Sequence, residues 1–97
     1  MARIVGGWSE TFLADDIQSI CNEVKPKVEE KTGKKHGIFR ALKYKVMALC
    51  GGTHYLIMVY VGFDNYFQIH VFQDIEGRSE VENVQEGLHR YDPIIMH

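Results

Sequence analysis

The sequence YKVMALCGGTHYLIMVYVG, from Tyr44 to Gly62, decides the fold. Two apolar runs flank the pair Gly51-Gly52, and a glycine pair between two such runs predicts a β-hairpin. The second run is rich in β-branched and aromatic residues, which favour strands. Apolar groups gain nothing from contact with water, so an apolar hairpin tip suggests a wedge for another protein's cleft. Three apolar residues lie at this tip, namely Ala48, Leu49 and Cys50.

The bulk composition indicates one folded domain, residues 1–97, with a modest core. The chain is 45% hydrophobic and 25% charged, near the average for a folded protein, so the composition does not indicate disorder. The net charge of −2 implies no general attraction to nucleic acid or to acidic lipid. Residues 25–45 are basic and residues 74–92 are acidic, and we interpret both segments as solvated faces.

The sequence carries no mark of export or of membrane insertion. The start, Met1 to Val5, is too short for the apolar region of a signal peptide. No run approaches the roughly 18 apolar residues of a membrane helix, and the two cysteines form no disulfide framework. We therefore expect a cytoplasmic protein whose thiols are reduced.

A helix is predicted to begin at Asp15, a good N-cap residue, and to end at Gly33. Its apolar residues recur at helical spacing, as Ile17, Ile20, Cys21, Val24 and Val28. Cys21 is thus expected to be a small buried hydrophobe and not a reactive thiol. Pro26 removes a backbone donor and predicts a kink within the helix. Residues 1–14 show no period and are expected to form a flexible trunk.

From residue 38 onward the period changes to two, which predicts strands. The first strand is expected to place three apolar side chains on one face, Leu42, Tyr44 and Val46. Turns at 62–65 and 76–79 separate three further strands, 53–61, 66–71 and 80–88. Short connections make these strands antiparallel neighbours, so the prediction is an α+β fold in which one helix covers one face of a sheet.

No pattern in the sequence argues for an enzyme, a cofactor or a metal. The five histidines are scattered, and no two lie four residues apart on the predicted helix. Cys50 and His54 are near in sequence but are expected on opposite sides of the hairpin tip, without a third catalytic group. Gly51-Gly52 is a turn and not a phosphate-binding loop.

Several short motifs follow one another in a characteristic order over residues 6–77. They are Gly6-Gly7-x-Ser9-Glu10, Val24-Lys25-Pro26, Glu29-Glu30-Lys31-Thr32, Tyr44-Lys45, Thr53-x-Tyr55, Val59 and Val71-Phe72. In this order they resemble the stefins, the intracellular type 1 cystatins. The resemblance implies the cystatin fold, a four- or five-stranded antiparallel sheet wrapped around one N-terminal helix. It also implies reversible, competitive inhibition of papain-like cysteine proteases such as cathepsins.

In stefins the trunk and two hairpin loops enter the active-site cleft of the protease. A trunk glycine lets the backbone pass close to the protease, and a stiff wedge loses little entropy on binding. Carried over by position, the implied protease-binding residues are Gly6, Gly7, Met47, Ala48, Leu49, Cys50, Gly51, Ile75, Glu76 and Gly77.

Both loops depart from the stefin pattern. The family's first loop is Gln-x-Val-x-Gly, but here either Met47 or Ala48 stands at the glutamine position and the loop is one residue longer. In the second loop, Ile75-Glu76 replaces a stiff apolar pair. The alternative hypothesis is a stefin-fold protein with a decayed inhibitory edge, which acts through protein–protein contact or self-association.

Two features indicate routes to self-association of an otherwise monomeric protein. Cys50 at the tip could link two chains through a disulfide, and exchange of the first hairpin could give a domain-swapped dimer. The family register also places an apolar stripe on the outer face of the sheet, where it is either a partner surface or a set of scattered exposed groups. This stripe consists of Leu56, Met58 and Tyr60.

Overall fold

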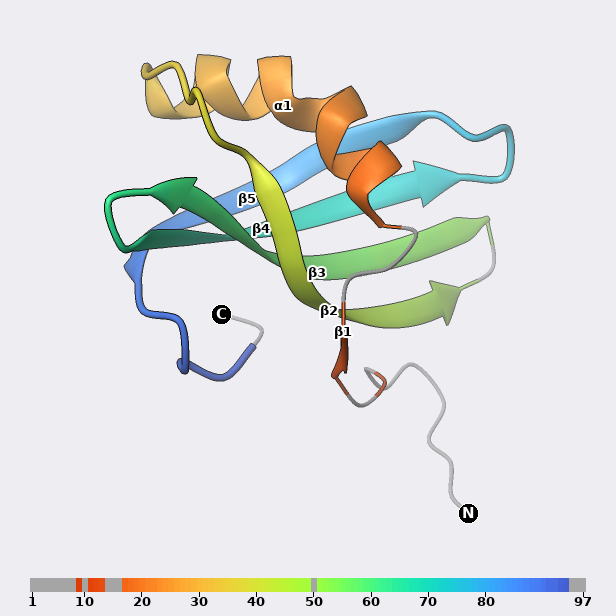
Figure 1. Ribbon diagram of the computed structural model, residues 1–97. Coiled ribbons are helices and arrows are strands. Elements are labelled where there is room, and N and C mark those ends of the chain that lie inside the picture. Colours follow the sequence, from red (N-terminus) through yellow and green to blue (C-terminus); the bar gives the residue numbers. More distant parts are fainter. Residues whose placement is uncertain (1–8, 10, 14–16, 50, 95–97) are drawn as a thin grey trace.

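The computed structural model describes residues 9, 11–13, 17–49 and 51–94. The elements in chain order are β1 (Phe12–Leu13), α1 (Gln18–Thr32), β2 (Arg40–Leu49), β3 (Gly52–Gly62), β4 (Asn65–Asp74) and β5 (Ser79–Leu88). The strands form one antiparallel sheet in the order β1-β2-β3-β4-β5, and α1 lies across one of its faces (Figure 1). The predicted α+β fold with a four- to five-stranded sheet is therefore confirmed.

Helix α1 begins at Gln18 and not at the predicted Asp15, which lies outside the described residues. The N-cap residue, Ile17, makes no side-chain hydrogen bond to the helix. The Gln18 amide instead joins the helix to β2, because its Nε2 donates to Phe39 O (2.9 Å) and its Oε1 accepts from Ala41 N (2.8 Å). The side chain of Gln18 thus ties the start of the helix to the sheet.

The end of α1 agrees with the sequence pattern. Pro26 lies inside the helix, which continues to Thr32. Gly33 then adopts a left-handed conformation (φ 73°), and its N–H donates to Glu29 O at 2.9 Å. This conformation favours glycine and stops the helix. The predicted C-terminal cap is confirmed.

The main core lies between α1 and the sheet. Its buried members come from the predicted helix stripe, from Phe39 just before β2 and from alternate residues of the strands. They are Ile17, Cys21, Val24, Val28, Phe39, Ala41, Ile57, Val59, Phe67, Ile69, Val71 and Val81. Cys21 is fully buried among them, as predicted. Because this layer is made from both elements, neither α1 nor the sheet can bury its apolar face alone.

The Cys21 thiol should not react in the folded protein. Burial raises the pKa of this thiol from 9.0 to about 12, so almost no reactive thiolate forms at neutral pH. Since the folded pKa lies above the unfolded one, the stability linked to this group is present below about pH 9 and is lost as the pH rises toward 12. We expect iodoacetamide to modify Cys21 only after denaturation, measured by mass spectrometry on a Cys50→Ser variant. Equal modification of the folded and denatured variant would contradict this.

The prediction that Leu42 shares a face with Tyr44 is wrong. The register of β2 against β3 shifts between Ala41 and Lys43, so Leu42 is the extra residue of a β-bulge. Tyr44 packs against the main core, whereas Leu42 packs on the opposite face of the sheet. The bulge reverses the inward and outward alternation that a regular strand would keep.

The outer face of the sheet carries a second apolar cluster. It contains Leu56, Met58, Tyr66 and Ile94, with Leu42, Tyr60 and Leu88 packed against it. The C-terminal segment 89–94 follows β5 on the side of the sheet away from α1 (Figure 1), and Lys43 Nζ donates to Asp92 O at 3.0 Å. Ile94 is 2% exposed, Leu56 1% and Met58 0%. The predicted outer stripe does lie on this face, but the chain itself covers it, so it is not an open partner surface.

The described part of the predicted flexible trunk is docked on the sheet. Ser9 exchanges two hydrogen bonds with Val46, each of 2.9 Å, one from its N–H and one to its Oγ. Phe12 and Leu13 then pair with β2 as a short edge strand. Among the described residues, α1 falls short of the length and apolar character that a membrane span requires.

Candidate functional site

The first loop connects β2 to β3 through a two-residue hairpin turn. Leu49 and Gly52 are the last paired residues, so the connection consists of Cys50 and Gly51. Gly51 has φ 95°, a conformation that favours glycine at such a turn. Ala48 is exposed and Met47 is half-buried, whereas Cys50 and the Leu49 side chain lie outside what the structure describes. The predicted hairpin is confirmed, but the prediction that Gly51-Gly52 forms its turn is wrong, because Gly52 pairs with Leu49 and is the first residue of β3.

The second loop, residues 75–78, is built around one carboxylate. Asp74 Oδ1 accepts hydrogen bonds from the N–H groups of Glu76 and Arg78, both at 2.9 Å. Asp74 O accepts a further bond of 3.0 Å from Gly77, which has φ 90°. Ile75 is left pointing to solvent and is 83% exposed. The loop is therefore rigidly held while presenting an apolar side chain to water.

The two loops share one end of the sheet and are joined at their bases. Gly52, which follows the first loop, is the direct cross-strand partner of Asp74, which precedes the second. Figure 1 shows both loops at the same end, with β1 alongside β2. The structure thus brings together seven of the predicted site residues, Met47, Ala48, Leu49, Gly51, Ile75, Glu76 and Gly77, although of Leu49 it describes only the backbone. The predicted trunk residues, Gly6 and Gly7, lie outside the described residues.

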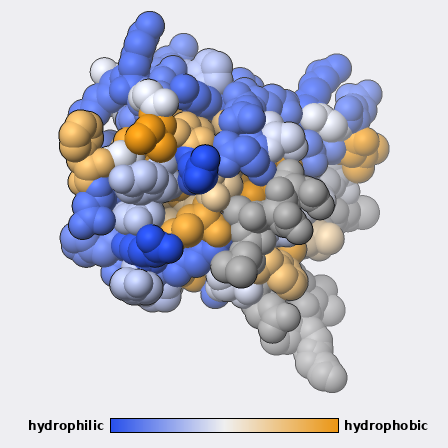
Figure 2. Space-filling view, in the orientation of Figure 1, coloured by the Kyte–Doolittle hydropathy of each residue, from blue (hydrophilic) through white to orange (hydrophobic). Residues whose placement is uncertain are grey.

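The second loop carries charged side chains of both signs. Glu76 and Arg78 form an ion pair of 3.7 Å across the second loop, but both side chains are more than two-thirds exposed. Such exposed pairs contribute little to stability because water and salt screen them. On the face drawn in Figure 2, apolar atoms occur in several separate places on a mostly hydrophilic surface. Ile75 is the exposed large apolar side chain of the second loop.

Sequence reasoning missed three residues that support the loops: Gly52, Phe72 and Asp74. A Cβ atom added to Gly52 would stand 2.5 Å from Gln73 O and 2.6 Å from Phe72 Cε1, so only glycine fits. An aspartate directly before a turn is a known signal for side-chain capping of the loop, and it could have identified Asp74. Nothing in the sequence shows that the Phe72 ring covers Gly52, because this contact depends on the register of β3 and β4.

Two of the histidines that are scattered in the sequence meet in the fold. His54 Nδ1 and His70 Nε2, on adjacent strands, are 2.8 Å apart and share a hydrogen bond. The expectation concerned sequence spacing, and sheet register brought the two rings together. Even so, no three His, Cys, Asp or Glu side chains gather into a metal-binding group within the described parts of the chain.

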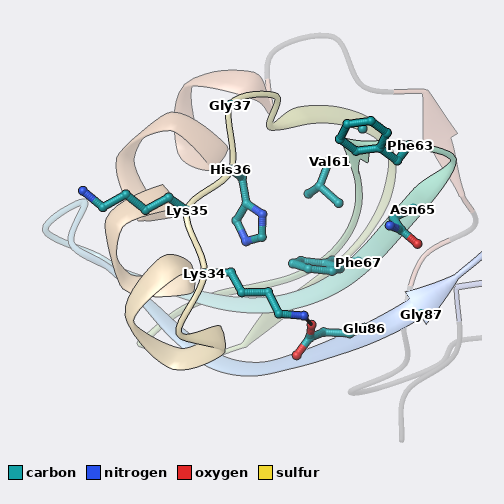
Figure 3. A pocket seen from close by; sticks show the side chains of 11 residues that line it. Lys34, Lys35, His36, Gly37, Val61, Phe63, Asn65, Phe67, Glu86 and Gly87 are labelled. Carbon is teal, nitrogen blue, oxygen red and sulfur yellow. Dashed lines mark ion pairs between the residues drawn. The ribbon is translucent and has the colours of Figure 1, made fainter.

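A separate cavity of about 430 Å³ lies at the opposite end of the sheet, beside the β3–β4 turn (Figure 3). His36 points into it, edge-on to the Phe67 ring with centroids 5.0 Å apart. Lys34 and Glu86 form an ion pair of 3.7 Å at its mouth, and Lys35 points away from it. None of the predicted site residues lines this cavity. The candidate site is therefore the loop end.

A sheet wrapped around one helix, with two hairpin loops at one end, is the arrangement of a cystatin-type protein. Comparison with known proteins agrees. The chain is 37% identical to Cystatin-B of Oplegnathus fasciatus over 97% of both chains. It is 40% identical to human Cystatin-A over 79% of both chains, and 44% identical to Leukocyte cysteine proteinase inhibitor 1 of Sus scrofa over 79% of this chain and 75% of the relative. No family model matches. The chain belongs to the stefin family of cystatins.

Proposed function

We propose that this protein is a reversible, competitive inhibitor of papain-like cysteine proteases, the cathepsins among them, and that it acts in the cytoplasm. One observation carries the proposal: the two loops are joined through Gly52 and Asp74, and the second presents an 83% exposed isoleucine. The pig relative is named as a cysteine proteinase inhibitor, which supports the same activity and a non-enzymatic role.

The physics of the loop end suits a wedge. Burying an exposed isoleucine in an apolar cleft contributes roughly 1.5–3 kcal/mol. The hydrogen bonds from Glu76 and Arg78 to Asp74 fix the loop before binding, so little conformational entropy remains to be lost. The trunk would add its contacts alongside the first loop, because Ser9 is bonded to Val46 of β2.

The alternative, a stefin-fold protein with a decayed inhibitory edge, rests on the departures in the two loops. It loses one possible contact surface, the outer apolar stripe, because Leu56 and Met58 are 1% and 0% exposed. The missing glutamine of the first loop remains a departure from the stefin pattern, since Met47 cannot form an amide hydrogen bond. We therefore place the activity at the loop end and expect the departures to affect affinity and target choice.

A titration of papain with the purified protein under reducing conditions tests the proposal. We expect competitive, sub-micromolar inhibition, and we expect Leu49→Asp to weaken it by about 100-fold or more, because the cleft would desolvate an unpaired carboxylate. Phe63→Asp is the matched control, since Phe63 is 96% exposed at the opposite end of the sheet. No inhibition by the wild type at tens of micromolar, or equal inhibition by Leu49→Asp, would contradict the proposed function.

A further inference from the structure

The outer face of β3 and β4 carries a line of contacts that runs away from the two loops. Its members, which we name the loop-base cluster, are Gly52, Phe72, His54 and His70. They alternate between the two strands, and each contacts the next. The cluster begins at the first residue after the first loop and lies next to Asp74, which holds the second loop. It therefore belongs to the strands that position both loops.

The contact nearest the loops is between Gly52 and Phe72. The Phe72 ring lies so close over Gly52 that a Cβ there would be 2.6 Å from both Cε1 and Cζ of the ring. The Phe72 ring fills the space that a side chain at position 52 would otherwise occupy. The lateral position of the first loop is thus set against β4, the strand that leads into the second loop.

The Phe72 ring is in turn held by the histidine pair. The rings of His54 and Phe72 have centroids 4.8 Å apart, and His54 Nδ1 lies 2.8 Å from His70 Nε2. Such a bond needs one imidazole as N–H donor and the other as acceptor. When both rings are protonated, both nitrogens are donors, so the bond is lost and two positive charges face each other.

We propose that Phe72, His54 and His70 are positioning residues of the protease-binding end, which hold the first loop in place relative to the second, and that protonation of both histidines releases this hold. The inference rests on the proposed function and deepens it, because it makes the inhibitor's affinity depend on pH. None of the three residues needs to touch the protease. They act through Gly52 and through the strand that ends at Asp74.

Burial and the neighbouring charges set the direction of the effect. The pKa of His70 is lowered, first by burial and then by the neighbouring His54, while Glu82 of β5 opposes the shift. On the same face, Lys45 of β2 is opposite Leu56 and Glu80 of β5 is opposite Phe72. Because the folded pKa of His70 lies below its usual value, stability linked to this group is present above about pH 6.5 and is lost as the pH falls.

Papain inhibition measured at about pH 7.5 and about pH 5 tests the inference. For the wild type we expect affinity to be roughly fivefold weaker at the lower pH, the equivalent of one lost hydrogen bond. The double variant His54→Gln, His70→Gln can still form a hydrogen bond but does not titrate, so most of the fall in affinity should be absent from it. His89→Gln, at an exposed position beyond β5, is the control and should show the same fall in affinity as the wild type. Because the wild type and the variants are compared at the same pH, the effect of pH on papain itself cancels.

Hydrogen exchange of the free protein gives a second readout that needs neither a protease nor a variant. We expect protection factors of residues 52–54 and 72–74 to fall at the lower pH, relative to residues 63–66 at the opposite end. An unchanged ratio, or a double variant that keeps the full affinity drop, would overturn the inference. If the wild type inhibits at neither pH, the proposed function fails, and the exchange ratio still decides whether the pair holds the loops.

Discussion

Replacing Ile57 with alanine is expected to lower the free energy of unfolding by about 3–4 kcal/mol, within the range for large-to-small core substitutions. Ile57 is fully buried on the helix side of β3, directly between Tyr44 of β2 and Ile69 of β4. Neighbours in a continuous sheet cannot move in to fill the cavity without breaking the strand register. For a chain of 97 residues this corresponds to a fall in Tm of roughly 15–25 °C.

Ile75→Ala is the matched control, because the same atoms are removed from a residue that is 83% exposed. Its stability should stay within about 0.5 kcal/mol of the wild type, while papain affinity should fall by about 10-fold as the buried contact is lost. Ile57→Ala should behave in the opposite way, with near-normal affinity while folded. Urea denaturation and inhibition assays on both variants separate the two roles. A loss below about 1 kcal/mol for Ile57→Ala would contradict the packing described above.

The local patterns of the sequence predict much of this fold. The glycine pair at 51–52 predicted the first hairpin, and the left-handed position of Gly33 was predicted from its place after the helix stripe. Both depend on backbone conformations that few residues other than glycine adopt, so the sequence signal is strong. The period of the helix likewise identified the residues that pack on the sheet, Cys21 among them.

Features that depend on long-range register were not predictable. The bulge at Leu42 lets Tyr44 pack on the side of α1 and Leu42 pack in the outer cluster, and no residue within the strand indicates it. Ile94 belongs to the same buried cluster as Leu56 and Met58, although it lies more than 30 positions from them in sequence. Burial there depends on where the C-terminal segment crosses the sheet.

The candidate site likewise has residues that the sequence predicts and supporting residues that depend on long-range register. The residues of the two loops followed from the resemblance to stefins, but the groups that hold the loops did not. Asp74 bonds to backbone N–H groups of its own loop, a local arrangement that its sequence position indicates. The approach of His54 to His70 instead arises from diagonal neighbours on two strands, which only the register defines. A sequence pattern within one segment cannot indicate a contact of this kind, because the contact joins residues of two strands.

Gly52→Ala should therefore affect both stability and affinity, since Gly52 belongs to the sheet and to the loop end. The new Cβ would stand 2.5 Å from Gln73 O and 2.6 Å from the Phe72 ring. The ring can rotate, but the carbonyl belongs to the backbone of β4, so the two strands must separate where the loops meet. Overpacking of this kind costs about 1–3 kcal/mol, and a shift between the two halves of a rigid binding surface should weaken papain inhibition by about 10- to 100-fold.

Gly37→Ala is the control, because Gly37 has no atom within 4 Å of an added Cβ and lies at the other end of the molecule. Gly37→Ala should change the free energy of unfolding and the free energy of papain binding by no more than a few tenths of a kcal/mol. Urea denaturation and papain inhibition, corrected for the folded fraction, then distinguish two explanations. If Gly52→Ala loses stability but each folded molecule inhibits normally, the loops keep their places without the contact between Gly52 and Phe72. If affinity falls further than the folded fraction explains, the spacing of the loops is set at this contact, as the packing of the Phe72 ring requires.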